Sequence, residues 1–131
     1  MKGFEGSIEM QTLENEKFRK VLYTGGHLQL VLMSLKPVEE IGEEIHQNND
    51  QFFRFESGTG MCTIDESNYH VTGGDAIVIP AGARHNVINT GTEACKMYTI
   101  YAPPNHQDGI TRATKEEADT KDEKFTAATS E

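Results

Sequence analysis

The sequence predicts an all-β domain that folds as a sandwich or a closed barrel. Short segments with apolar or alternating side chains recur from about residue 18 to residue 104. Turn-forming residues separate these segments roughly every 8 to 12 positions, which is typical of both folds. No repeat of the solenoid type is present. We therefore expect roughly eight or nine strands in a single domain. They cover residues 18–23, 27–36, 41–46, 51–56, 61–65, 69–72, 75–79, a segment that begins by presenting His85, and residues 94–102.

The most apolar of these segments is residues 27–36, which Gly25, Gly26 and Pro37 bracket. Its apolar side chains occupy both alternation classes, so both faces of the strand should be covered. We expect the core to cover one face and another sheet or subunit to cover the other, which predicts a homodimer. A helical period of 3.6 also fits the segment, but its bracketing turn residues and β-branched content favour a strand.

The two ends of the chain differ from its middle. Residues 1–17 show no clear period and predict an N-terminal arm, or at most an edge strand. Residues 105–131 become polar and charged and predict a C-terminal tail that is frayed or holds a short helix. The β-domain itself is expected over residues 18–104.

The prediction of the functional site starts from residues 74–89. Residues 75–79 include Ile77, Val78 and Ile79, which predict a buried strand covered on both faces. Pro80 and Gly82 then predict a tight turn, because proline fixes φ and glycine tolerates a positive φ. A histidine placed directly after such a turn lies at the rim of a β-structure and can point inward.

Composition and charge exclude several classes of protein. The chain has 131 residues, which fits one domain, and its 21 acidic against 12 basic residues give a net charge of −9. Nucleic acids and anionic membranes are therefore unfavourable partners. No apolar run approaches a membrane span, and the first residues lack the apolar region of a signal peptide, which predicts a cytoplasmic protein. Cys62 and Cys95 are expected to be buried free thiols, rather than a disulfide or metal ligands.

Four polar side chains are expected to converge inside the domain. Glu44 and His46 are two residues apart on a strand and so share one face. If residues 41–56 form a hairpin, its turn brings Gln51 back to within about 5 Å of that face. His85 would add a fourth ligand from the second half of the domain. Two imidazoles, a carboxylate and an amide oxygen suit Fe(II), Mn(II), Ni(II) or Zn(II). The competing interpretation is an ordinary polar network without metal.

Other assignments near this site remain open. Asn48 can replace Glu44 as the partner of His46, although this places a ligand in a turn. Asp50 is expected to cap that turn. We expect His27, His70 and His106 at solvated or edge positions. His106 is also kept as a weak candidate over the barrel mouth, because it follows Pro103 and Pro104. With Gln51 inward, alternation also directs Phe53 and Phe55 inward, where they would make an apolar cavity of the kind that binds small molecules. In the last strand, Met97, Thr99 and Tyr101 are expected on the inner face.

Two motifs resemble those of the cupin family. The second cupin motif is matched at every position. The match consists of Gly74, five residues, Pro80, one residue, Gly82, two residues, His85, three residues and Asn89. The first motif is a His-x-His pair, then a glutamate and a glycine. Its spacing is matched by Glu44, His46, four residues, Gln51, six residues and Gly58. Here glutamate stands in place of the first histidine, and glutamine in place of the glutamate.

The resemblance to small single-domain cupins of the conserved-barrel type implies a double-stranded β-helix, or jelly-roll, barrel that holds one divalent metal. His46 and His85 match the family's ligands directly, whereas Glu44 and Gln51 match by position only. The resemblance also implies action on a small molecule. The candidate activities are a metal-dependent dioxygenase and a sugar isomerase or epimerase similar to mannose-6-phosphate isomerase. A non-enzymatic ligand-binding or sensor domain is the second interpretation, and a purely structural dimer module is the third.

Overall fold

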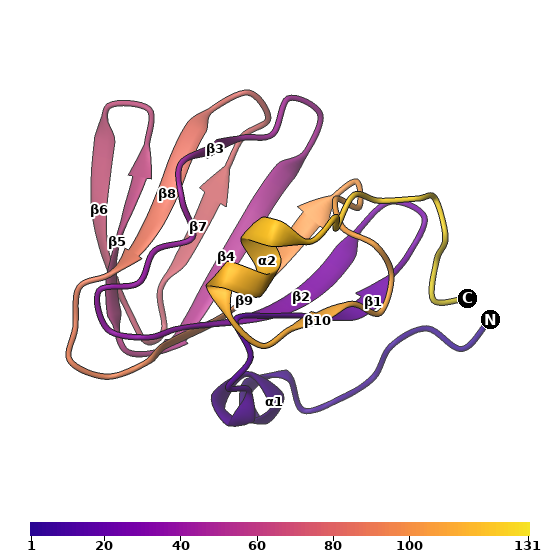
Figure 1. Ribbon diagram of the computed structural model, residues 1–131, viewed down its shortest axis with the longest axis horizontal. Coiled ribbons are helices and arrows are strands. Elements are labelled where there is room, and N and C mark those ends of the chain that lie inside the picture. The colour runs from indigo at the N-terminus through magenta and orange to yellow at the C-terminus, as the bar shows by residue number, and fades with distance from the viewer.

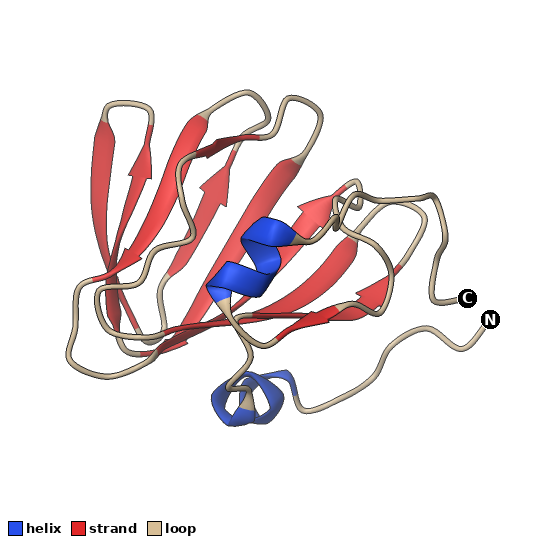
Figure 2. Ribbon diagram, in the orientation of Figure 1, coloured by secondary structure: helices blue, strands red, loops and turns tan.

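The computed structural model describes residues 1–131, and two antiparallel β-sheets enclose one hydrophobic core (Figures 1 and 2). The larger sheet has six strands in the order β10-β1-β2-β9-β4-β7, and the smaller has four in the order β3-β8-β5-β6. The all-β prediction is confirmed, and β1 to β9 fall on the predicted segments. Their bounds are β1 Arg19–Thr24, β2 Gln29–Leu35, β3 Glu44–Ile45, β4 Asp50–Ser57, β5 Thr59–Ile64, β6 Ser67–Thr72, β7 Ala76–Ile79, β8 Arg84–Asn89, β9 Cys95–Ala102 and β10 Thr111–Arg112.

Strands β4 and β9 pair along their whole length at the centre of the larger sheet and supply much of its inner face. Burial alternates along both strands as period-two side chains require. Phe53 and Phe55 point inward from β4, while Met97, Thr99 and Tyr101 point inward from β9, as predicted. Burial of a large apolar side chain contributes about 1.5–3 kcal/mol, so this face fixes which side of each strand lies inside.

The predicted hairpin at residues 41–56 is wrong, because β3 and β4 belong to different sheets. β3 pairs with β8, whereas β4 pairs with β7 and β9. Residues 46–49 therefore carry the chain from one sheet to the other instead of turning it back within one. The four turn-forming residues between the strands are compatible with either path, and the pairing of β3 with β8 decides it.

Strand β7 is an edge strand of the larger sheet. The prediction that both of its faces are covered is wrong. Its only strand partner is β4. Ile79 is buried, but the side chain of Val78 alternates to the outer face and is 65% exposed. A run of β-branched residues therefore reflects strand propensity here and not two-sided burial.

A short helix at the N-terminal end, α1 (Ile8–Glu14), was not predicted. It packs outside the larger sheet against β9 and β4, and the Lys96 Nζ donates a hydrogen bond to the Leu13 carbonyl at 2.6 Å (Figure 1). Only Thr12 of this helix is buried, whereas Met10 and Leu13 are exposed, so its sequence shows no helical apolar period. The predicted burial of both faces of residues 27–36 is found over residues 31–35 of β2, which are all buried.

Residues 105–131, expected as a polar tail, return over the β-domain and form β10 and α2 (Lys115–Thr120). Thr114 caps α2, since its hydroxyl accepts a hydrogen bond from the Glu117 amide at 3.1 Å. Arg112 pairs with Arg19 as β10 joins the edge of the larger sheet. The end of the chain is also fixed, because the Ser130 amide donates to the Thr24 carbonyl at 2.9 Å. Neither helix has the length or apolar character that crossing a bilayer requires.

Candidate metal centre

Glu44, His46 and His85 form a compact cluster between the two sheets. Glu44 and His85 are direct partners across the antiparallel β3–β8 ladder, so their side chains share a face. His46 lies two residues after Glu44 and falls on that face as well. One candidate ligand atom from each residue lies within 4.8 Å of the others. The predicted convergence of these three side chains is therefore found, but through β3–β8 pairing and not through a hairpin.

His85 is positioned as a metal-binding histidine would be. Its side chain is 4% exposed, and its Nδ1 lies 3.0 Å from the carbonyl oxygen of Ala83, to which the ring N–H donates. That bond fixes the tautomer and leaves the Nε2 lone pair free. Nε2 is buried, has no hydrogen-bond partner, and lies 4.0 Å from Glu44 Oε2. An unpaired buried acceptor directed at a carboxylate fits a cation between them.

The carboxylate of Glu44 is the most exposed member of the cluster. His46 Nε2 lies 3.0 Å from Glu44 Oε2, a distance at which the ring N–H donates to the carboxylate. Burial acts to raise the pKa of Glu44, but the hydrogen bond and charge of His46, together with the charge of Arg19, outweigh burial and lower it. Glu44 is therefore ionised near neutral pH, as a ligand for a divalent cation must be.

Gln51 reaches the same interior from the opposite sheet. Its Nε2 donates to the Thr99 hydroxyl at 3.0 Å, which turns the amide oxygen away from Thr99. That oxygen is buried without a hydrogen-bond partner. Tyr101, the cross-strand partner of Gln51, places its ring edge-on to His46 with centroids 5.6 Å apart. The donor atoms present, two imidazole nitrogens, a carboxylate oxygen and a free amide oxygen, fit a divalent transition metal.

The structure separates the other sequence candidates. Asn48 is exposed in the turn and does not join the cluster. Asp50 caps a different turn from the predicted one, since its Oδ1 accepts a hydrogen bond from the Ala81 amide at 2.9 Å. Cys62 and Cys95 are buried free thiols, and burial raises the pKa of each to about 11.

His106 lies inside the molecule, although a solvated or edge position was expected. Its ring packs edge-on against Tyr101 with centroids 5.0 Å apart, and its Nε2 is buried without a hydrogen-bond partner. Burial, followed by the nearby charge of Arg19, lowers the pKa of His106 to about 2, so the ring is neutral. No sequence spacing links His106 to His46 and His85. The return of residues 105–124 across the β-domain places His106 beside Tyr101.

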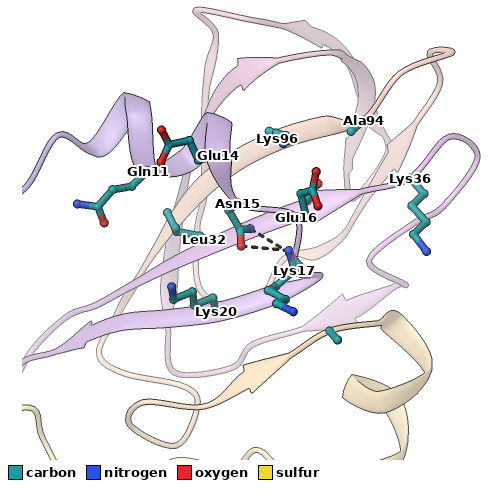
Figure 3. Close-up of a pocket in the computed structure, with 12 residues that line it drawn as sticks. Gln11, Glu14, Asn15, Glu16, Lys17, Lys20, Leu32, Lys36, Ala94 and Lys96 are labelled. Carbon is teal, nitrogen blue, oxygen red and sulfur yellow. Dashed lines mark hydrogen bonds between the residues drawn. The ribbon is translucent and has the colours of Figure 1, made fainter.

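One cavity of the structure shares no residue with this cluster. It measures about 770 Å³ and lies outside the larger sheet beside α1 (Figure 3). Polar residues dominate its lining, including Lys17, Lys20, Lys36 and Lys96. A second cavity of about 290 Å³ adjoins the cluster, because Glu44 forms part of its wall. The candidate metal centre therefore lies beside the smaller of these two cavities.

A small all-β barrel with a His, His and Glu cluster between its sheets is the class that this fold and site define. Residues 31–101 match the cupin domain, and the chain belongs to the cupin family. The predicted double-stranded β-helix fold is confirmed by its similarity to an uncharacterized conserved protein with a double-stranded β-helix domain from Klebsiella pneumoniae. That similarity has a TM-score of 0.63 at 20% identity and covers 77% of this chain and 88% of that one.

Proteins of higher sequence identity match most of this chain. The crystal structure of BH2720 from Bacillus halodurans matches with a TM-score of 0.90 at 43% identity, covering 92% of this chain and 96% of that one. The uncharacterized protein YrkC of Bacillus subtilis (strain 168) is 48% identical over an alignment of 123 residues, and the match covers 89% of this chain and 66% of that protein. The uncharacterized protein L612 of Acanthamoeba polyphaga mimivirus is 45% identical over an alignment of 107 residues, and the match covers 79% of this chain and 67% of that protein. The chain thus spans about two thirds of the length of these curated relatives.

Proposed function

We propose that this cupin binds one divalent transition metal through Glu44, His46 and His85, with the amide oxygen of Gln51 as a fourth ligand, and uses it to act on a small molecule. The observation that carries the proposal is the buried, unpartnered Nε2 of His85, held toward Glu44 by the hydrogen bond of Nδ1 to Ala83. Fe, Mn, Ni and Zn all accept this set of donors.

A metal-dependent oxygenase is the activity that the donor set supports best. Two histidines and one carboxylate with open positions are the ligands of non-haem Fe(II) oxygenases, and iron so held supplies redox chemistry toward dioxygen. The chain contributes orientation and shielding. His85 and Gln51 are buried, and the ring of Tyr101 packs beside His46. Glu44 borders the adjoining cavity, so a substrate would approach from that side.

Metal content tests the first half of the proposal. Protein purified without chelator or tag and then incubated with each metal should retain about one equivalent after gel filtration. Metal at 100 times its Kd should also raise the free energy of unfolding by about 2.7 kcal/mol. His85→Gln and His46→Gln should lower metal affinity at least tenfold, since each removes a ligand. His70→Gln, at an exposed position on β6, is the matched control.

The role of Gln51 has its own variant in the same assay. Gln51→Glu should tighten metal binding, because it adds a charged ligand at the same position, whereas Gln51→Leu should weaken it. Metal well below one equivalent in the wild type, unchanged after addition of Fe, Mn, Ni or Zn, would falsify the metal proposal.

Turnover assays separate the candidate activities. Oxygen uptake by the Fe(II)-loaded protein with catechols, flavonols and diketones tests the oxygenase. An assay with hexose phosphates tests a sugar isomerase or epimerase, whose Lewis-acid chemistry the same metal could supply. Tight binding of a small molecule without turnover in either assay would support the sensor function instead.

We also propose that the protein is a cytoplasmic homodimer. Its free cysteines are compatible with a reducing compartment. The support for a dimer is a row of apolar and aromatic side chains on the outer face of β7, β4 and β9, which we call the outer row: Val78, Phe52, Tyr98 and Ile100. Val78 and Phe52 are cross-strand partners, as are Phe52 and Ile100, and the rings of Phe52 and Tyr98 lie 6.2 Å apart. A second copy could bury this row.

A further inference from the structure

Two arginines, Arg19 buried and Arg112 largely so, lie side by side next to the candidate metal centre. Arg19 on β1 and Arg112 on β10 are direct cross-strand partners, and their side chains are only 6% and 13% exposed. Like charges in this relation destabilise a sheet unless a counter-charge lies between them. The structure supplies that counter-charge from the C-terminal segment.

Glu123 bridges the two arginines but leaves their charge partly uncompensated. Its carboxylate lies 2.5 Å from Arg19 Nη1 and 3.0 Å from Arg112 Nε, and its side chain is 9% exposed. His106 Nδ1 lies 3.4 Å from the same carboxylate, but this ring is neutral and adds no charge. Two guanidinium groups therefore share one carboxylate, and the group of residues carries a net positive charge.

The cavity of about 290 Å³ connects this positive group to the metal centre. Arg19, His106 and Glu123 form one part of its wall, and Glu44 forms another. Arg19 Nε and His106 Nε2 are buried without hydrogen-bond partners. Buried polar atoms left unpaired are costly, so a ligand that pairs with them gains affinity. At about 30 Å³ for each water-sized group, the cavity accommodates about ten non-hydrogen atoms.

We propose that this cavity is a carboxylate-binding subsite, in which Arg19 recognises the carboxylate of a small organic acid whose neighbouring hydroxyl or carbonyl oxygen faces the metal centre. A guanidinium pairs with a planar carboxylate through two parallel N–H donors, which an ammonium cannot reproduce. The neutral His106 offers its free Nε2 as an acceptor for a hydroxyl of the ligand. The cavity wall also carries two further carboxylates, Glu44 and Asp119, and two lysines, Lys121 and Lys124, so it has no charge excess that would favour a phosphate dianion over a monocarboxylate.

This inference names the substrate class of the proposed function, but only the oxygen facing the metal depends on that function. Matched pairs of probes test it: lactate with lactamide, and benzoate with benzamide, each titrated calorimetrically into metal-free and metal-loaded protein. Each acid should bind at least about tenfold more tightly than its amide, because the amide loses the charge-assisted pairing with Arg19. Inorganic phosphate should bind more weakly than the acids.

Substitution of Arg19 is the decisive variant. Arg19→Gln should remove the preference for acid over amide, and Arg19→Lys should restore it only in part. Arg54→Gln is the control, because Arg54 lies on the outer face of β4 with its side chain 41% exposed. If Arg19→Gln does not fold, the double variant Arg19→Gln/Glu123→Gln removes one charge of each sign and serves instead.

The outcomes separate the inference from the proposed function. Equal affinity for acids and amides in the wild type overturns the inference, even when the metal binds. A preference that persists in the folded Arg19 variant, or tighter binding of phosphate than of the acids, also overturns it. A wild type that binds no metal but keeps the preference for acids supports the subsite while the metal proposal fails.

Discussion

His106 shows how burial sets the behaviour of a single residue. The groups that face it are Tyr101, the carboxylate of Glu123, the two arginines Arg19 and Arg112, and, across the ring of Tyr101, His46. Of these only Glu123 carries a negative charge, and it already contacts both arginines. The interior therefore offers a protonated imidazole no free counter-ion, which is why His106 stays neutral.

Stability should consequently fall in mild acid. The pKa of His106 is about 2 in the folded chain and about 6.5 when the chain is unfolded. Because the folded value is depressed, its contribution is present above pH 6.5 and is lost as pH falls from 6.5 toward 2. This one group should lower the free energy of unfolding by up to about 1.4 kcal/mol per pH unit in that window. Urea unfolding of metal-free protein at pH 7.5, 6.5 and 5.5 measures it.

Two substitutions check the assignment to His106. His106→Gln should flatten the pH dependence below pH 6.5, since the side chain no longer titrates. His70→Gln should leave it unchanged, because His70 is exposed on β6. An unchanged slope in His106→Gln would show that other groups cause the acid sensitivity.

At the residue level, the sequence identified the three side chains that the structure brings together. Glu44 and His46 followed from their spacing on a strand, and His85 followed from the turn chemistry of Pro80 and Gly82 that precedes it. His106 could not be placed in this way. Its position depends on the return of residues 105–124 across the barrel, and only contacts distant in sequence determine that path.

At the scale of elements, the turn between β4 and β5 has little room. Gly58 adopts a φ of +84°, and a Cβ at this position would lie 2.5 Å from the Ala94 carbonyl oxygen and 2.7 Å from the Cys95 Cα. These contacts are with backbone atoms of the chain entering β9, which cannot move aside as a flexible side chain can. Glycine is therefore required here for two reasons, its positive φ and the close approach of another strand.

Gly58→Ala should lower the free energy of unfolding by about 3 kcal/mol, the sum of conformational strain and overpacking. Gly109→Ala is the matched control. Gly109 also has a positive φ, of +71°, but no atom within 4 Å of the added Cβ. Its cost should be about 1 kcal/mol, from the backbone alone. Denaturant unfolding of both variants measures the difference, and equal losses would mean that the contact with Ala94 and Cys95 is unimportant.

The strands were predictable because local features define them, namely alternating side chains and turn residues. Their partners were not. The polar turn after His46 fits a hairpin and a sheet-to-sheet crossing equally, and only the pairing of β3 with β8 distinguishes them. Helix α1 was missed because it buries a single residue, Thr12, and so leaves no periodic signal. The outward position of Val78 depends on which strand lies at the edge, which local sequence does not specify.

At the scale of the whole molecule, the outer row makes the proposed homodimer testable. Sedimentation equilibrium of the wild type at micromolar concentration should give the mass of a dimer. Val78→Lys should shift the mass toward that of a monomer, because it places a charge in the apolar contact. Its fold should be unaffected, since Val78 is exposed in the isolated chain.

Tyr69→Lys is the control for this substitution. Like Val78, Tyr69 is a large exposed side chain, but it lies on β6 in the smaller sheet, away from the outer row. It should leave the dimer intact. A wild type that sediments only as a monomer would refute the dimer, and a dimer unaffected by Val78→Lys would place the interface elsewhere.

The pairing order of the larger sheet also has a consequence for synthesis on the ribosome. Its central ladders join Gln29 to Tyr101 and Phe53 to Thr99, and its edge joins Arg19 to Arg112. The early strands β1, β2 and β4 must therefore wait for β9 and β10 to be translated before the sheet can close. Pairing over such long loops is slow, and the waiting strands expose apolar surface to other nascent chains. We expect the yield of folded protein to depend strongly on expression temperature and on chaperones.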